Sequence, residues 1–273
     1  QEGGDAFNRE RGDIITTFVN QASISIENFH LIREALDNER YKEQLKIAKS
    51  VQKSLLPSVL ERNDCFEIEA YSMAADEVGG DYYDIIEPSK DIFNLIIGDV
   101  SGKGTSAAFN MAQMRGIFHS LAQDVSTPKE FITKANSAIG RCLEKNSFIT
   151  AIFFVINTRE KKFCYARAGH CPAMYYSAST GNITLLEKEG LGLGILRNSQ
   201  YNEYVQEETI NYQPGDLLLL YTDGISEAKN EYKKQYGADG LKSSLQNHIN
   251  APLSKLKDML INDRSEEHTS ELQ

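Results

Sequence analysis

The chain has 273 residues, of which 41% are hydrophobic and 25% charged, and these globular values exclude wholesale disorder and collagen-like repeats. Its formal net charge of −10 at pH 7 argues against binding to nucleic acid or to an anionic membrane surface. No apolar run approaches the roughly 18 residues of a bilayer span, and no signal peptide is visible. The four cysteines show neither CxxC pairing nor metal-finger spacing, so we expect buried free thiols in a reducing cytosol.

The first predicted element is a long helix. Residues 13–55 contain neither Pro nor Gly, and their apolar side chains recur at steps of three and four, which is typical of one helical stripe. One small domain cannot bury a stripe of this length, so we expect a coiled coil with a second copy of the chain, a homodimer. The charged residues 37–40 shift the register of the stripe. The alternative is two separate helices packed on the same domain.

Beyond Pro57 the pattern changes to short strands with two helices between them. Apolar runs and alternations predict strands at residues 66–72, 92–97, 148–156, 163–168, 174–177, 183–186 and 217–221. One helix carries an apolar face over residues 108–121, and another begins at Thr127, where Glu130 completes a capping box. Because hairpins dominate over strict βαβ alternation, we predict mainly antiparallel sheets flanked by helices, an α+β fold.

Three aspartates lie next to glycines at the predicted strand ends. Asp81 follows two glycines, Asp99 follows Gly98, and Asp223 precedes Gly224. Carboxylates that are brought together repel one another, and a divalent cation is the usual resolution. Oxygen ligands without clustered His or Cys favour Mg²⁺ or Mn²⁺ over zinc. Taken singly, each Gly-Asp or Asp-Gly pair is also typical of an ordinary turn.

Five motifs occur in series: EVGGDYYD at 77–84, GDVSGKG at 98–104, AGH at 168–170, PGD at 214–216 and YTDGISEA at 221–228. In this order and spacing they resemble the SpoIIE/RsbU branch of the PPM-type serine/threonine protein phosphatases, and the resemblance extends from about residue 46 to residue 260. It implies an antiparallel β-sandwich flanked by helices, the αββα arrangement of PPM phosphatases, preceded by a long coiled-coil-like helix.

The resemblance also implies a metal centre. Members of this family hold two Mn²⁺ or Mg²⁺ ions with aspartates at the positions of Asp81, Asp99 and Asp223, and with a backbone carbonyl at the position of Val100. The ions activate a water for in-line attack on phosphoserine or phosphothreonine, without a covalent intermediate. By the same resemblance, the substrate is a STAS-type anti-sigma-factor antagonist. We expect His170 to be packed or hydrogen-bonded, and Lys103 to be solvated.

Residues 18–28 resemble the closing helix of a GAF sensor domain. We therefore expect a GAF remnant at 1–32, a helical linker at 33–57 and a phosphatase domain at 58–263, which the upstream sensor regulates. The final segment, RSEEHTSELQ at 264–273, resembles the translation of a sequencing adapter. The family domain ends with an Asp-Asp pair that supplies a metal ligand, and no such pair follows Asp263. We expect weak or absent activity for residues 1–273.

Two other functions stay open. One is a catalytically impaired phosphatase that only binds a partner. The other is a diguanylate cyclase, because residues 79–81 superficially resemble its GGDEF loop, although Tyr82 and Tyr83 replace the Glu and Phe of that motif. The glycine-rich stretch 190–194 imitates a nucleotide-binding loop, but no strong helix follows it, so we interpret it as close backbone packing.

Overall fold

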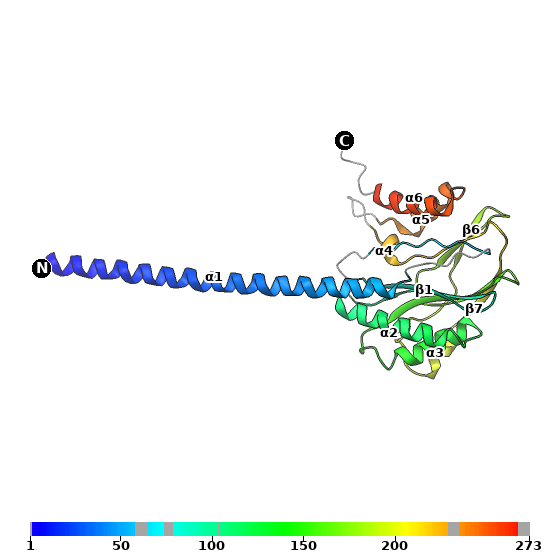
Figure 1. The fold of residues 1–273 in the computed structure, drawn as a ribbon, viewed down its shortest axis with the longest axis horizontal. Helices are drawn as coiled ribbons and strands as arrows, with labels where there is room; N and C mark the ends of the chain where they lie inside the picture. The colour runs from blue at the N-terminus through cyan, green and yellow to red at the C-terminus, as the bar shows by residue number, and fades with distance from the viewer. Residues whose placement is uncertain (1, 58–64, 74–78, 103, 229–234, 267–273) are drawn as a thin grey trace. The chain divides into compact units, whose positions relative to one another are not determined.

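The computed structural model describes residues 2–57, 65–73, 79–102, 104–228 and 235–266 (Figure 1). The chain divides into two units, Gln1–Ile47 and Ala48–Gln273, which are described separately. In the described ranges, no helix is long and apolar enough to cross a lipid bilayer. None of the four cysteines is in a disulfide, and the expectation that they are buried is wrong for Cys65 and Cys142, which are exposed.

The first unit is helical up to its boundary, because helix α1 covers Glu2–Leu55. The prediction of one long helix is confirmed, and the alternative of two separate helices is wrong. The charged residues 37–40 shift the apolar stripe but do not interrupt the helix, since they are exposed and leave the backbone hydrogen bonding intact. Large apolar side chains of this unit that are more than half exposed are Ile14, Ile15, Phe18, Val19, Ile24, Ile26, Phe29, Leu31, Ile32, Leu36, Tyr41 and Ile47.

Two antiparallel sheets form the centre of the second unit (Figure 1). The larger sheet has the order β1-β2-β3-β4-β7, with bounds Asp81–Ser89, Ile92–Val100, Ile149–Asn157, Lys162–Ala168 and Glu207–Asn211. The smaller sheet has the order β6-β5-β8, with bounds Asn182–Leu186, Ala173–Ser177 and Leu217–Leu219. The helices are α2 (Thr105–Leu121), α3 (Pro128–Ile139), α4 (Asp223–Ser226), α5 (Gly237–His248) and α6 (Leu253–Glu266), with a 3₁₀ helix at Ser199–Tyr204.

Alternation along the strands sorts the core into three layers. On β3, Phe153 packs on the side of α2 and α3, where its ring stacks on Phe131 with centroids 3.8 Å apart, while Phe154 faces the second sheet. On β5, Tyr175 joins the layer between the sheets, and Met174 joins the layer under α5 and α6. Because successive strand residues face opposite sides, each sheet is covered on both faces, by helices on one face and by the other sheet on the other. The predicted αββα sandwich is confirmed (Figure 1).

The predicted helix start at Thr127 is also confirmed. The Thr127 hydroxyl accepts a hydrogen bond from the backbone N–H of Glu130, and the Glu130 carboxylate accepts one from the N–H of Ser126. The first contact satisfies a donor that the first helical turn leaves without a partner, and the second ties the residue before the N-cap to the helix. At the start of α2, Gly104 occupies the N-cap with φ of 72°, a conformation that favours glycine.

Two strand predictions are wrong. Residues 67–73 form no strand, and only Phe66 makes an isolated bridge, with its ring edge-on to Phe93. The alternation there reflects a partly buried segment, and residues 71–73 are all exposed, so no continuous face is buried. Strand β8 ends at Leu219 rather than at residue 221, because the chain turns toward α4. Strands β1 and β7, helices α4 and α5 and the 3₁₀ helix were not predicted.

Candidate metal centre

The β1–β2 hairpin brings the first two predicted aspartates together. Asp81 is the first residue of β1, Asp99 is the last but one of β2, and the antiparallel register places them directly opposite each other. Side chains of such cross-strand partners lie on the same face, with Cβ atoms about 4.5–5.5 Å apart. The sequence alone did not predict this pairing.

Asp223 reaches the same place from far along the chain. It is the first residue of α4, and the preceding hydroxyl, Thr222 Oγ1, donates a hydrogen bond to Asp81 Oδ2 at 3.2 Å. The negative charge of Asp223 raises the pKa of both Asp81 and Asp99. The structure therefore brings all three predicted aspartates into one neighbourhood.

The electrostatics of this neighbourhood favour a bound cation. Burial first, and then the charges of Asp81 and Asp223, raise the pKa of Asp99 to about 7. Burial also raises the pKa of Asp81, although the hydrogen bond from Thr222 opposes this effect. A bound divalent cation would lower the pKa of these carboxyl groups, because its positive charge favours their ionised form.

Gly80 shapes the space between the ligands. A Cβ at this position would lie 2.5 Å from Asp99 Oδ1 and 2.5 Å from the carbonyl oxygen of Val100. The two oxygens thus converge on the space that a side chain would fill, and the N–H of Val100 holds the loop by donating to the carbonyl of Gly80 at 3.2 Å. Carboxylate and carbonyl oxygens are the donors that Mg²⁺ and Mn²⁺ prefer.

The acidic side chains do not all lie within coordination distance of one common point. Among the residues that the structure describes, no three His, Cys, Asp or Glu side chains are arranged as a ready-made chelating group. The donor types and the space above Gly80 fit a hard divalent cation, and the three carboxylates would draw closer around it. Asp263 is not available for this purpose, because its carboxylate accepts hydrogen bonds from Ser244 and from His248 Nε2.

Gln52 is a site residue that sequence reasoning missed. It lies near the end of α1 and within the second unit, and its side chain is buried. Its Nε2 donates to the carbonyl of Gly79 at 2.5 Å, and its Oε1 accepts from the N–H of Gly79 at 3.1 Å. Both polar groups of Gly79, two residues before Asp81, are therefore held by one amide. No local pattern could have indicated a contact across 27 residues.

His170 has the structural role that the sequence suggested. Its side chain is 2% exposed, and its Nδ1 lies 2.9 Å from Thr150 Oγ1 on the strand that pairs with β2. Arg167 Nη1 donates to the carbonyl of His170 at 2.6 Å. Burial lowers the pKa of His170 to about 4, so the imidazole is neutral at pH 7.

This burial predicts a pH-dependent stability. Because the folded-state pKa of about 4 lies below the ordinary 6.5, the unfolded chain binds the proton first, and stability falls as pH drops through this window. The linkage amounts to about 2 kcal/mol between pH 7.5 and pH 5. A His170→Asn variant should lose less stability by about that amount, measured by urea unfolding at both pH values. Equal losses in the two proteins would contradict the prediction, and the shifts of Asp81 and Asp99 cancel in the difference.

Asp216 and Gly190 have structural roles. Asp216 of the PGD motif accepts hydrogen bonds from the backbone N–H groups of Ala178 and Gln213, both at 2.8 Å, and from the Tyr175 hydroxyl. A Cβ on Gly190 would lie 1.5 Å from the carbonyl oxygen of Arg167, so the interpretation of residues 190–194 as close backbone packing is confirmed. Lys103 lies outside the described residues.

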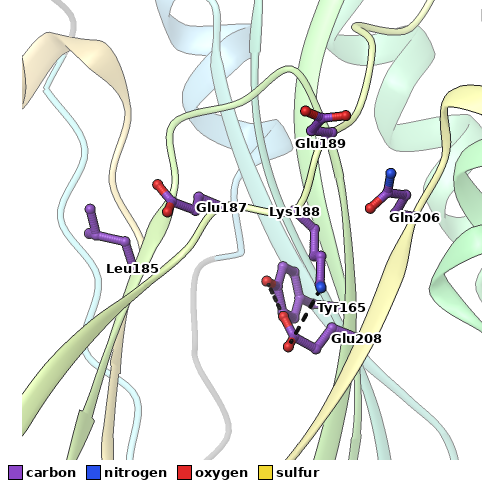
Figure 2. A pocket seen from close by; sticks show the side chains of 7 residues that line it. All are labelled: Tyr165, Leu185, Glu187, Lys188, Glu189, Gln206 and Glu208. Carbon is purple, nitrogen blue, oxygen red and sulfur yellow. Dashed lines mark hydrogen bonds and ion pairs between the residues drawn. The ribbon is translucent and has the colours of Figure 1, made fainter.

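A polar hollow of about 360 Å³ lies elsewhere, and none of the three aspartates lines it (Figure 2). Its lining residues are Tyr165, Leu185, Glu187, Lys188, Glu189, Gln206 and Glu208. The Tyr165 hydroxyl donates to Glu208 Oε2 at 2.9 Å, and Lys188 Nζ lies 3.9 Å from the other oxygen of this carboxylate. The only cation of the lining is thus paired, and its three glutamates disfavour a phosphate ligand.

Comparison with known proteins identifies relatives of this domain. The family described as stage II sporulation protein E (SpoIIE) matches residues 89–273. The phosphoserine phosphatases RsbU and RsbP of Bacillus subtilis (strain 168) are 31% and 26% identical over 193 and 224 residues. These matches cover 71% and 81% of this chain but 56% and 52% of the relatives, so the chain spans about half their length. The SiaA-PP2C domain of Pseudomonas aeruginosa is 18% identical, with a TM-score of 0.69 over 87% of this chain and 94% of that one, which shows a PP2C-like fold.

Proposed function

Because the chain belongs to the SpoIIE family of PPM-type phosphatase domains, we propose that it hydrolyses phosphoserine or phosphothreonine on a signalling protein, with Mn²⁺ or Mg²⁺ as cofactor. The observation that carries the proposal is the convergence of Asp81, Asp99 and Asp223 beside the carbonyl of Val100. The names of RsbU and RsbP, both phosphoserine phosphatases, support the reaction class.

In this proposal the chain holds the cofactor and orients the phosphoryl group. Asp81 and Asp99 project from opposite strands of a rigid hairpin, and Asp223 begins a helix that Thr222 ties to Asp81. When bound, the divalent ions supply an activated water and offset negative charge on the phosphoryl oxygens. Cys171 is not a candidate nucleophile, because burial and the charge of Asp223 raise the pKa of its thiol to about 11.

We propose a STAS-type anti-sigma-factor antagonist as the substrate. We propose the cytoplasm as the location, because none of the four cysteines is in a disulfide. The test is release of inorganic phosphate from a serine-phosphorylated STAS-domain protein by the full-length protein, with Mn²⁺, with Mg²⁺ and with EDTA. We expect release with a metal ion and none with EDTA. Release that is unchanged by EDTA would reject the metal-dependent mechanism.

A second candidate function is a module that binds the phosphoprotein without turnover. It is favoured by the absence of a closed acidic cluster in the described residues and by the capture of Asp263 by His248 and Ser244. The same assay separates the candidates, because this module would bind the phosphoprotein in the presence of Mn²⁺ and release no phosphate.

We also propose that the helix of the first unit pairs with a second copy and transmits a signal from a sensor of the GAF type. The support is its row of exposed apolar side chains, among them Phe18 at 73%, Phe29 at 62% and Ile32 at 61% exposed. At 100° per residue, Phe18, Phe29 and Leu36 share one face of the helix, and coiled coils bury a face of this kind.

The pairing predicts a change of oligomeric state. We expect residues 1–273 to sediment as a dimer and a Phe29→Glu, Leu36→Glu variant to sediment as a monomer at the same concentration, because two carboxylates would be buried in the apolar seam. Asn20→Glu is the matched control, since Asn20 lies on the opposite helix face. A double variant that remains dimeric would refute pairing through this face.

A further inference from the structure

Beside the metal centre lies a small apolar surface made by Phe148 and Ile195, with the buried Gly192 beneath them. Phe148 is 38% exposed and Ile195 is 52% exposed, although both are large hydrophobic residues. We infer that this surface, called the 148/195 patch, docks the folded protein that carries the phosphorylated serine. The inference rests on the proposed function and extends it, because it assigns residues that select the protein rather than the phosphate.

The patch is joined to the metal-binding loop by backbone contacts. The N–H of Ser101 donates to the carbonyl of Phe148 at 3.0 Å, and the N–H of Phe148 donates to Ser101 Oγ at 2.8 Å. Ser101 directly follows Val100, whose carbonyl we assign to the metal centre. The first of these hydrogen bonds extends the pairing of β2 with β3, which places Asp99 opposite Thr150, and the second is made by the Ser101 side chain. A protein whose phosphoserine reaches Asp99 is therefore well placed to cover Phe148.

The floor of the patch is fixed. Leu193 exchanges two backbone hydrogen bonds with Ile149, at 2.8 and 3.0 Å, so the glycine-rich segment is anchored to the start of β3. A Cβ on Gly192 would lie 3.0 Å from Ile195 Cδ1 and 3.5 Å from Phe148 Cδ2. The two side chains thus lie side by side over a glycine. This preorganised apolar surface costs little conformational entropy on binding.

Charge indicates why the docking surface is apolar. The chain carries a formal charge of −10, and a phosphoserine adds about −1.5 to −2 on the partner. Long-range electrostatics therefore do not favour the encounter outside the metal centre itself. Affinity for a particular phosphoprotein must come from short-range contacts, and burial of aromatic and aliphatic side chains is the usual source at protein interfaces.

The test measures binding with the metal removed, so that no turnover consumes the ligand. Residues 1–273 are titrated calorimetrically in EDTA with a serine-phosphorylated STAS-domain protein and with a short phosphoserine peptide from its modified site. We expect the protein to bind at least tenfold more tightly than the peptide. A Phe148→Ser, Ile195→Ser variant should lose this advantage. Met259→Ser is the matched control, because Met259 on α6 is 37% exposed and should leave binding unchanged.

One further variant, measured by binding and by unfolding temperature, makes the outcome unambiguous. Ile195→Asp alone changes an exposed position and should weaken binding without lowering the unfolding temperature, which separates docking from misfolding. Equal binding of wild type and double variant, or no binding of the protein by wild type, would overturn the inference. Neither result affects the phosphatase proposal, which is judged by metal-dependent phosphate release from the short peptide by the full-length protein.

Discussion

Replacing Asp99 with asparagine is expected to lower metal-dependent phosphate release by the full-length protein about 100-fold or more. Asp99 Oδ1 and the carbonyl of Val100 converge above Gly80, so an amide in place of the carboxylate removes a charged ligand from the centre of the site. Residues 1–273 with this substitution should also bind Mn²⁺ at least tenfold more weakly in a calorimetric titration. The second measurement does not depend on turnover.

The same substitution should stabilise the metal-free protein. The folded-state pKa of Asp99, about 7, lies above its ordinary 3.8, so the fold holds a proton that the unfolded chain releases. Stability contributed by this group is therefore lost as pH rises from about 4 through 7. Asparagine carries no charge and avoids the loss. In EDTA at pH 8 we expect a higher unfolding temperature for Asp99→Asn than for wild type.

Asp91→Asn is the matched control for both measurements. Asp91 lies in the turn of the same hairpin, just before the start of β2, whereas Asp99 lies near the end of that strand. Its φ of 68° is a conformation that asparagine also adopts. It should change neither metal affinity nor turnover. Full turnover by Asp99→Asn would remove Asp99 from the metal centre.

Replacing Gln52 with leucine should disorder the approach to Asp81. The variant keeps the volume of the buried side chain but leaves the N–H and carbonyl of Gly79 without the two hydrogen bonds that they now make. Such a loss costs about 2–3 kcal/mol in unfolding free energy. Because Gly79 leads directly into Gly80 and Asp81, we also expect turnover to fall about tenfold or more.

Two variants define what the Gln52 result means. Gln44→Leu changes an exposed glutamine of the same helix and should affect neither stability nor turnover. Gln52→Glu retains an acceptor for the N–H of Gly79 but loses the donor for its carbonyl, so its turnover should lie between those of wild type and Gln52→Leu. A Gln52→Leu protein that is destabilised but fully active would show that the contact stabilises the fold without positioning the metal loop.

The local signals in the sequence predicted much of the fold. The capping pattern at Thr127 predicted a helix start, and turn residues predicted the β3–β4 and β5–β6 hairpins but not the β1–β2 hairpin, because such signals depend on neighbours within a few positions. Strand β7 was missed because its sequence EETIN is largely polar and it pairs only with β4. The strand predicted at 66–72 was wrong for the opposite reason. Its residues alternate as in a strand, but the segment does not pair into either sheet.

Some residues of the site could be predicted from the sequence and others could not. Asp81, Asp99 and Asp223 were predicted from motifs, and the structure brings them together. The contact of Gln52 with Gly79 and the exposed pair Phe148 and Ile195 were not predicted. These features depend on distant backbone positions, and single glutamine, phenylalanine and isoleucine residues carry no signal of such contacts.

The topology also determines the order in which the three carboxylates come together during folding. Asp81 and Asp99 face each other within one hairpin, whereas Thr222, next to Asp223, meets Asp81 across 141 residues. Closing so long a loop costs more entropy than closing a hairpin. A nascent chain can therefore form the first pair of carboxylates well before the third has left the ribosome. Tight capture of a divalent cation becomes possible only after Asp223 has been synthesised and has joined the other two carboxylates.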